Sequence, residues 1–175
     1  AEASFDWDNY LFVTLSGRND WVSNLPTENN NQFYPSASVS FLPTAAFDGL
    51  RSDNGLNYLK LRAGIGTSAG FPGGFPTVDT VNQATQVNGG AVGGSTGIVT
   101  NGISNFKSNP DLKPELLSEF EVGFDARLWN NRINLSLSYF DRTTKDLIVF
   151  KPLAPSSGFT QTQDNIGKVE GDGWE

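Results

Sequence analysis

The residues that could carry acid–base chemistry are gathered in one short segment. Glu119 and Glu121 are two positions apart, and Asp125 follows four positions later. Paired carboxylates can act as a general acid and a general base. Residues at i and i+2 of a strand share one face, so the same spacing also fits a charged strand face compensated by Lys60 and Arg62 on another strand. The charged face is the commoner arrangement, and we predict it here.

The composition excludes most kinds of catalytic and cofactor-binding site. The chain of 175 residues contains no histidine and no cysteine. A Ser–His or Cys–His nucleophile pair is therefore impossible, and the usual zinc, iron–sulfur and haem ligands are missing. We expect no catalytic residue, no metal site and no cofactor, and we predict that the protein is not an enzyme.

Two short motifs begin like ligand-binding loops but do not complete them. Gly64–Ala69 fits the G-x-G-x-x-G/A pattern of dinucleotide sites, which requires a helix to open directly after the glycines. Phe71–Pro76 follows and cannot be helical, so we predict a strand with small residues on one face. Asp6–Asn9 starts like a calcium loop but lacks its sixth-position glycine and distal glutamate, and so predicts a solvated turn.

The charge of the chain narrows the possible partners. The formal net charge is −7 and the isoelectric point about 4.5. Nucleic-acid binding needs a basic patch, so no nucleic acid is expected as a partner. Docking on an anionic membrane surface through a polybasic segment is excluded for the same reason.

The dominant pattern is an alternation of apolar and polar residues with a period of two, which indicates half-buried strands. Ala37, Val39 and Phe41, for example, alternate with serines. Strands are expected over residues 10–16, 33–42, 59–66, 119–128 and 133–139, with a last strand that begins near Asn165.

The connections between these strands differ greatly in length. Residues 18–32, 67–117 and 151–164 are long and polar, 43–57 is moderate with room for one helical turn, and 129–132 is a tight hairpin turn. Loops of about 50 residues are unusual inside compact soluble domains. Outer-membrane barrels, in contrast, alternate short periplasmic turns with long external loops. The pattern therefore favours a transmembrane barrel wall with the three long connections outside.

A soluble β-sandwich would show the same alternation, with its apolar faces turned to a core. The wet, serine-rich and charged character of the polar faces favours the barrel. Aromatic residues near the expected strand ends also favour it, because such residues form girdles at membrane interfaces. These residues are Tyr10, Phe33, Tyr34, Tyr58, Trp129 and Phe150. A secreted carbohydrate-binding sandwich remains the alternative.

Aromatic side chains in the long connections are the candidate ligand-binding residues. Trp21, Phe71, Phe75, Phe106 and Phe159 lie there, and sugars or peptides often stack on such side chains. Packing between loops, or against a partner protein, is the competing interpretation. The first four of these residues are our predicted ligand-binding set.

Several strings, in order along nearly the whole chain, resemble the SusC/RagA-type TonB-dependent outer-membrane transporters. They are Gly17–Trp21, Phe33–Ser36, Leu59–Gly64, the N-P-x-L-K-P-E string Asn109–Glu115, the hairpin Trp129–Arg132, Tyr139–Ile148 and Asn165–Glu175. Gly171 stands where the family usually has asparagine. Pro72–Asn105 matches nothing specific.

The resemblance implies a 22-stranded barrel in the bacterial outer membrane, with an N-terminal plug. It also implies a SusD-like lipoprotein lid, energy from an inner-membrane TonB complex, and an oligosaccharide or peptide cargo. We therefore expect an all-β protein of antiparallel strands that forms part of a large transmembrane barrel. Since barrels begin at about eight strands, residues 1–175 are expected to be a fragment of a single barrel domain. The plug would be absent, and the remaining polypeptide of the barrel would pair with both edges of the sheet.

Overall fold

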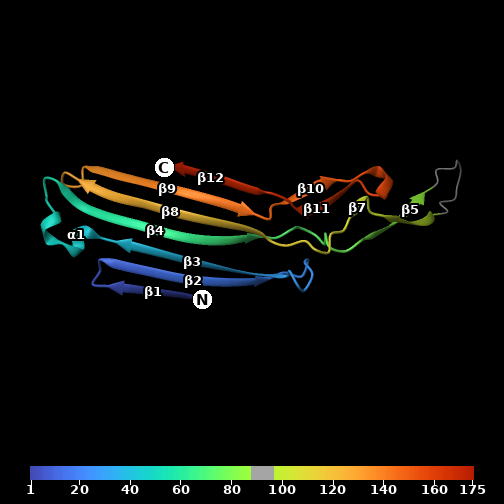
Figure 1. Cartoon of the computed structure of the whole chain (residues 1–175), viewed down its shortest axis with the longest axis horizontal. Coiled ribbons are helices and arrows are strands. Elements are labelled where there is room, and N and C mark those ends of the chain that lie inside the picture. The colour runs from blue at the N-terminus through green and yellow to red at the C-terminus, as the bar shows by residue number, and fades with distance from the viewer. Residues whose placement is uncertain (88–96) are drawn as a thin grey trace.

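The main body of the computed structural model, which describes residues 1–87 and 97–175, is one long antiparallel sheet (Figure 1). Seven strands lie in the order β1-β2-β3-β4-β8-β9-β12, and every neighbouring pair is antiparallel. Their bounds are β1 Glu2–Trp7, β2 Leu11–Trp21, β3 Asn31–Phe41, β4 Leu56–Gly70, β8 Glu115–Leu128, β9 Ile133–Lys145 and β12 Lys168–Trp174. We call this sheet the wall. Its outer strands β1 and β12 do not pair with each other, so the wall is open.

The remaining elements lie beyond the two ends of the wall strands. One end, the turn end, carries the helix α1 (Pro43–Ala46), the short 3-10 helix η1 (Asp48–Leu50) and two tight turns (Figure 1). The other end, the loop end, carries a three-stranded sheet in the order β10-β11-β7 and a β5-β6 hairpin. Their bounds are β5 Val81–Val87, β6 Gly97–Ile103, β7 Phe106–Lys107, β10 Ile148–Pro152, the 3-10 helix η2 Pro155–Ser157 and β11 Gln161–Asn165.

The register of the wall puts most of its apolar residues on one face. Val39 lies opposite Val13 on one side and Ala63 on the other, and Val122 lies opposite both Ala63 and Tyr139. Because side chains alternate along a strand, serine, glycine and charged residues predominate on the opposite face. We call these the apolar face and the polar face of the wall.

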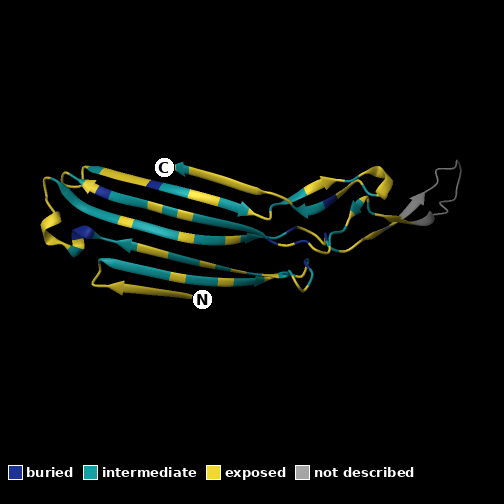
Figure 2. Ribbon diagram, in the orientation of Figure 1, coloured by how far each residue is buried: buried dark blue, intermediate teal, exposed yellow. Residues whose placement is uncertain are grey.

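Among residues 1–87 and 97–175, no second layer covers either face of the wall. Most wall residues are half-buried or exposed (Figure 2), and large apolar side chains such as Ile65 (59%) and Trp174 (70%) remain open. In a β-sandwich the apolar face would pack against another sheet. The sandwich alternative is therefore wrong for this chain, and the expected wall of antiparallel strands is confirmed.

A small buried core does exist, at the loop end. Leu112 is fully buried and Leu25 is 5% exposed. Pro72, Pro76 and Pro114 are buried as well. Leu25 comes from the first long connection and the other four residues come from the second, so the core joins these two outer loops.

The structure extends and corrects the predicted elements. The first long connection is shorter than expected, because β2 runs to Trp21 and β3 begins at Asn31. The very long one contains β5, β6 and β7, although residues 88–96 of it lie outside the described chain. The third, predicted as a loop over 151–164, holds the end of β10, η2 and most of β11. The helical turn near Pro43 and the hairpin turn at 129–132 are confirmed.

Three smaller expectations are also resolved. Gly64–Ala69 lies inside β4 and opens no helix, as predicted. Asp6–Asn9 forms the end of β1 and the tight turn into β2, closed by a hydrogen bond from the Asn9 N–H to Asp6 Oδ1 (3.0 Å). The strand β1 itself was not predicted. Within the described residues, no helix has the length and apolar character needed to cross a membrane.

Candidate functional site

An arginine lies at the centre of the polar face, held between two carboxylates of the neighbouring strand. Arg62 of β4 approaches Asp125 Oδ2 at 3.0 Å and Glu121 Oε1 at 3.4 Å. Asp125 also accepts a hydrogen bond from the Ser136 hydroxyl of β9 (2.7 Å). The carboxylates of β8 are thus a compensated strand face, as predicted, and Arg62 is the residue that compensates them. Lys60 lies opposite Asp125 in the register and its charge acts on that carboxylate, although the two groups form no ion pair within 4.0 Å in the described chain.

Gly123 gives Arg62 the space to lie along the sheet. It is the residue directly opposite Arg62 in the register, between Glu121 and Asp125. A Cβ atom there would come within 2.8 Å of the Leu137 carbonyl oxygen and 3.1 Å of Arg62 Nε. The side chain of Arg62 therefore occupies space that any larger residue at position 123 would take.

Two further cations of the polar face are paired, both nearer the loop end. Arg142 of β9 binds Glu119 of β8, with Nη2 and Oε2 2.5 Å apart. Arg18 of β2 binds Asp20 at 2.8 Å, and Asp20 also accepts a hydrogen bond from the Tyr34 hydroxyl. From the middle of the wall to the loop end, Arg62, Arg142 and Arg18 of the polar face thus each form an ion pair with a carboxylate.

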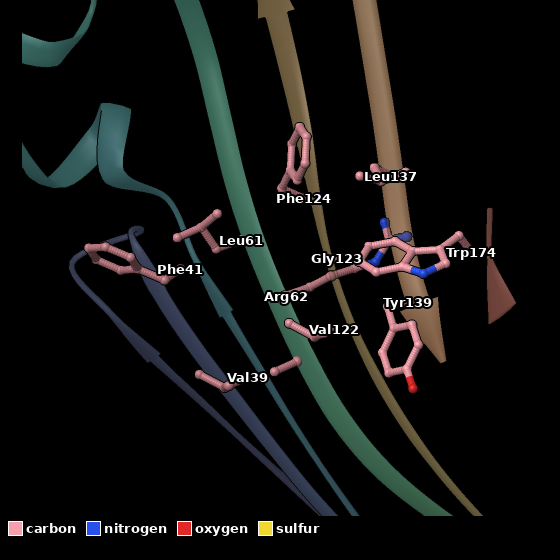
Figure 3. A pocket seen from close by; sticks show the side chains of 11 residues that line it. Val39, Phe41, Leu61, Arg62, Val122, Gly123, Phe124, Leu137, Tyr139 and Trp174 are labelled. Carbon is pink, nitrogen blue, oxygen red and sulfur yellow. The ribbon is translucent and has the colours of Figure 1, made fainter. Parts of the chain in front are cut away.

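The apolar face carries a shallow groove of about 360 Å³ across five strands (Figure 3). Its side chains include Val39, Phe41, Leu61, Val122, Phe124, Leu137, Tyr139 and Trp174. The rings of Tyr139 and Trp174 lie side by side, with centroids 5.0 Å apart. Apart from Arg62, Tyr139 and Trp174 the lining is apolar, so the surface suits contact with hydrocarbon better than the binding of a water-soluble ligand.

The outer loops are fastened together by the segment Asn109–Glu115. The backbone N–H of Asn109 donates to the Pro76 carbonyl (2.9 Å), and its side-chain amide donates to the Gln163 carbonyl (2.9 Å). The N–H of Lys113 donates to Asn165 Oδ1 (2.8 Å). One segment therefore holds the second and third long connections together around the buried Leu112.

Asn165 and Glu115 complete this fastening. The amide of Asn165 donates to the carbonyls of Lys113 (2.9 Å) and Asp146 (2.8 Å). Glu115 Oε1 accepts a hydrogen bond from the Ile148 N–H (2.7 Å). The sequence showed these residues as a family motif but gave no sign of their partners, which are 19–54 positions away.

An aspartate anchors the base of the β5-β6 hairpin. The hydroxyl of Ser108 and then its backbone N–H (3.2 Å from Asp79 Oδ1) donate to this carboxylate. Both bonds favour the charged form, so the pKa of Asp79 is lowered from the ordinary 3.8.

The structure does not bring the four predicted ligand-binding aromatics into one pocket. Trp21 is exposed at the end of β2, Phe71 is half-buried just after β4, and Phe75 is exposed in the following turn. Phe106 packs edge-to-face against Phe150, with ring centroids 6.3 Å apart.

The predicted interface aromatics fall into different groups. Tyr34 and Tyr58 lie on the polar face, because they share it with Arg18 and Arg127, whose guanidinium carbons lie 5.9 and 5.1 Å from their respective ring centroids. Phe150 belongs to β10, beyond the wall. The expectation of an interface girdle is wrong for the two tyrosines. Each lies one residue away from an apolar-face position, so its side chain is on the polar face. Tyr10 does lie at a strand end and packs edge-to-face on Phe41.

The described residues contain no group of three or more histidine, cysteine, aspartate or glutamate side chains that could hold a metal ion.

A family model agrees with this architecture. The model described as "TonB dependent receptor-like, beta-barrel" matches residues 1–175. The chain belongs to this family. Its known members are receptors and transporters of the bacterial outer membrane, not enzymes.

Curated relatives come from one bacterium. TonB-dependent receptor P3 of Formosa agariphila is 31% identical over 180 residues, which covers 98% of this chain and 17% of the receptor. TonB-dependent receptor P26 of the same organism is 30% identical over 176 residues, covering 96% of this chain and 16% of the receptor. The chain thus spans about a sixth of the length of these relatives.

Solved structures place the chain in the SusC/RagA-type group of this family. The RagAB peptide importer in its 'closed-closed' state superposes with a TM-score of 0.84 at 25% identity, covering 99% of this chain and 18% of that one. The siderophore receptor PirA of Pseudomonas aeruginosa shares the fold alone, with a TM-score of 0.60 at 18% identity over 99% of this chain and 29% of that one. The wall, its two unlike faces and its long outer loops are therefore features of a TonB-dependent transporter barrel.

Proposed function

We propose that this chain forms part of the barrel wall of an importer in the bacterial outer membrane, one that takes up oligosaccharides or peptides. The observation that carries the proposal is the single-layered wall, with an apolar face in register over seven strands and a polar, ion-paired face behind it. Lipid would cover the apolar face, and the polar face would line the transport path. The likeness to a peptide importer supports the cargo class.

The free edges of β1 and β12 support a further part of the proposal. An open sheet in hydrocarbon leaves backbone N–H and C=O groups unpaired, at a cost of several kcal/mol each. Residues 1–175 would thus be a section of a single barrel domain, with other strands of the same barrel paired to both edges. The plug, and with it the contact to the TonB complex, would come from polypeptide outside this section.

A SusD-like lipoprotein is proposed as the outer partner. The loop end presents exposed apolar side chains, among them Phe75, Val81 and Ile103, on loops that are fastened together. Exposed apolar patches of this kind mark surfaces for protein contact. Trp21, Phe71, Phe75 and Phe106 are proposed to contact the cargo or this lid. Trp21 and Phe75 are the better candidates, because the ring of Phe106 already packs against the ring of Phe150.

The topology is tested by protease treatment of intact cells that carry the full-length protein. Cleavage is expected within residues 22–30, 71–114 and 146–167, which belong to the loop end. The short connections 42–55 and 129–132 are expected to resist until the cells are opened. Cleavage of the short connections alone would reverse the topology, and extraction of the protein without detergent would remove the membrane from the proposal.

Transport is tested separately, by uptake of labelled peptides and oligosaccharides into cells with and without an active TonB complex. Uptake that needs both the full-length protein and the TonB complex is expected. Uptake that persists without the TonB complex would contradict the proposed energy source.

A further inference from the structure

The connection between β3 and β4 is longer than the reversal of chain direction requires. It runs over residues 42–55, although two residues are enough to join antiparallel strands. It contains α1 and η1 and lies at the turn end of the wall (Figure 1). We call residues 42–55 the β3–β4 connection. Its extra length allows contacts that a two-residue turn could not make.

Hydrogen bonds fix the β3–β4 connection to the wall and to the neighbouring turn. The Thr44 hydroxyl accepts a hydrogen bond from the backbone N–H of Leu59 in β4 (3.1 Å). The carbonyl oxygen of Gly55 accepts a hydrogen bond from the backbone N–H of Trp129 in the hairpin turn (2.9 Å). The connection therefore has a defined position relative to both faces of the wall.

The β3–β4 connection has an apolar side and a polar side. The ring of Phe47 packs edge-to-face on the ring of Phe41, with centroids 6.5 Å apart, and Phe41 lines the groove of the apolar face (Figure 3). Arg51 and Asp53 instead line a hollow that they share with Arg127 of the polar face. A segment with one apolar and one polar side, at the border of an apolar surface, has the character of an interfacial membrane element.

Phe47 extends the apolar face toward the turn end. It is 58% exposed, although it packs on Phe41. Tyr10 packs edge-to-face on the same ring of Phe41, with centroids 6.1 Å apart. A tight turn, a strand and the connection thus each contribute one ring to an aromatic cluster. Aromatic side chains are enriched where hydrocarbon meets the lipid headgroups, and this cluster lies where the apolar face ends.

The other strands of the barrel would not cover Phe47. β2 and β1 separate β3 from one free edge of the wall, and β8, β9 and β12 separate β4 from the other. Neighbouring strands lie about 4.8 Å apart, so a strand added at either edge would be roughly 14 Å or more from β3 and β4. The plug proposed above would lie inside the barrel, against the polar face. Lipid is therefore the occupant that adjoins the ring.

We propose that the β3–β4 connection rests on the periplasmic leaflet of the outer membrane and inserts the ring of Phe47 between phospholipid headgroups and acyl chains. This inference rests on the proposed function, because it requires that the apolar face contacts lipid and that the turn end faces the periplasm. The ring opposes movement of the wall along the membrane normal, since movement in either direction takes it out of the interface. The connection thereby helps to fix the depth of the barrel in the membrane.

A spin label on the purified full-length transporter in phospholipid vesicles tests the proposal. The variant Phe47→Cys carries the nitroxide label, after replacement of any cysteine elsewhere in the protein, since residues 1–175 contain none. The label collides with oxygen, which concentrates in hydrocarbon, and with a nickel chelate, which stays in water. Frequent collisions with oxygen and few with nickel are expected at position 47.

Two matched variants calibrate this measurement. Val39→Cys places the label on the apolar face, in the groove above the cluster. Arg51→Cys places it on the polar side of the same connection, at an exposed residue. The ratio of oxygen to nickel collisions at position 47 is expected to lie between the two and to exceed the ratio at position 51 several-fold.

Two results at position 47 would overturn the inference. Nickel collisions as frequent as at position 51 would place the ring in water. Few collisions with either reagent would show that protein covers the ring, such as a periplasmic segment of the chain outside residues 1–175. If position 39 still shows the collisions typical of hydrocarbon, either result removes only the membrane contact of the connection. Frequent nickel collisions at position 39 would overturn the proposed function as well, because the apolar face would then not contact lipid.

Discussion

The wall and the outer loops are stabilised by different means within one chain. The wall has an exposed apolar face, a polar face closed by ion pairs and almost no buried side chains. The outer loops, in contrast, contain buried side chains. A fully buried Leu112 and three buried prolines lie under a network of backbone and amide hydrogen bonds. The wall therefore depends on its surroundings for burial, whereas the loop end carries its own small core.

The largest effect that separates the two regions is expected from Leu112→Ala. Removal of a fully buried leucine side chain costs about 2–5 kcal/mol. Here the loss should be local, so hydrogen exchange should accelerate in residues 71–80 and 146–167 while the wall strands keep their protection. Leu50→Ala, at an exposed leucine, is the matched control and should change little. Equal acceleration in the wall would mean that the two regions unfold as one.

A charge on the apolar face tests whether the wall depends on lipid. Val39→Arg should destabilise the folded barrel by about 2–4 kcal/mol, because the guanidinium would enter hydrocarbon. Ser38→Arg, one residue away on the polar face, should cost much less. Unfolding titrations of the full-length protein in lipid vesicles measure both. Similar costs for the two variants would contradict the assignment of the faces.

The close approach of Arg62 to the sheet is tested by Gly123→Ala. The added methyl group would meet the Leu137 carbonyl oxygen and Arg62 Nε, and overpacking of this kind costs about 1–3 kcal/mol. Gly66→Ala is the control on the same face, since its Cβ would meet nothing within 4 Å. The same unfolding titration compares the two. A neutral Gly123→Ala would show that Arg62 is free to move off the wall.

The smallest effect concerns the Asp79 anchor. Its pKa is lowered by the bonds from Ser108, so the folded state gains stability above the ordinary value of 3.8 and loses it as the pH falls through the lowered value. Hydrogen exchange of residues 104–108, corrected for the intrinsic rate, should therefore accelerate at acidic pH. Asp79→Asn should remove this pH dependence and leave the wall unchanged. A pH dependence retained in the variant would assign it to another group.

The wall was the predictable part of the fold. Its strands show an unbroken period of two, and the ordered family strings supported the same interpretation. Even so, β1 was missed, although Ala3, Phe5 and Trp7 alternate with polar residues, because only six residues carry the pattern there. The faces of Tyr34 and Tyr58 were misjudged, since a position near a strand end does not reveal which face a residue takes.

The outer loops were beyond prediction for a different reason. β5, β6, β7, β10 and β11 have only two to seven residues, and β7 pairs in parallel with a strand more than fifty positions away. Such pairings have no local periodicity to reveal them. At the polar face, the sequence predicted that basic residues of β4 compensate the carboxylates of β8. The ion pairs of Arg62 confirm this prediction. The register and the side-chain distances were needed to show that Lys60 and Arg127 form no ion pair within 4.0 Å among the described residues.

The fastening of the outer loops around Leu112 has an energetic consequence for recognition. Ordering a free loop on binding costs conformational entropy, which reduces the affinity of any contact that the loop makes. Loops held by Asn109, Lys113 and Asn165 have already lost most of that conformational entropy during folding. A lid or a cargo that meets this end of the barrel would find a preorganised surface, so a few exposed aromatic side chains could give useful affinity without a deep pocket.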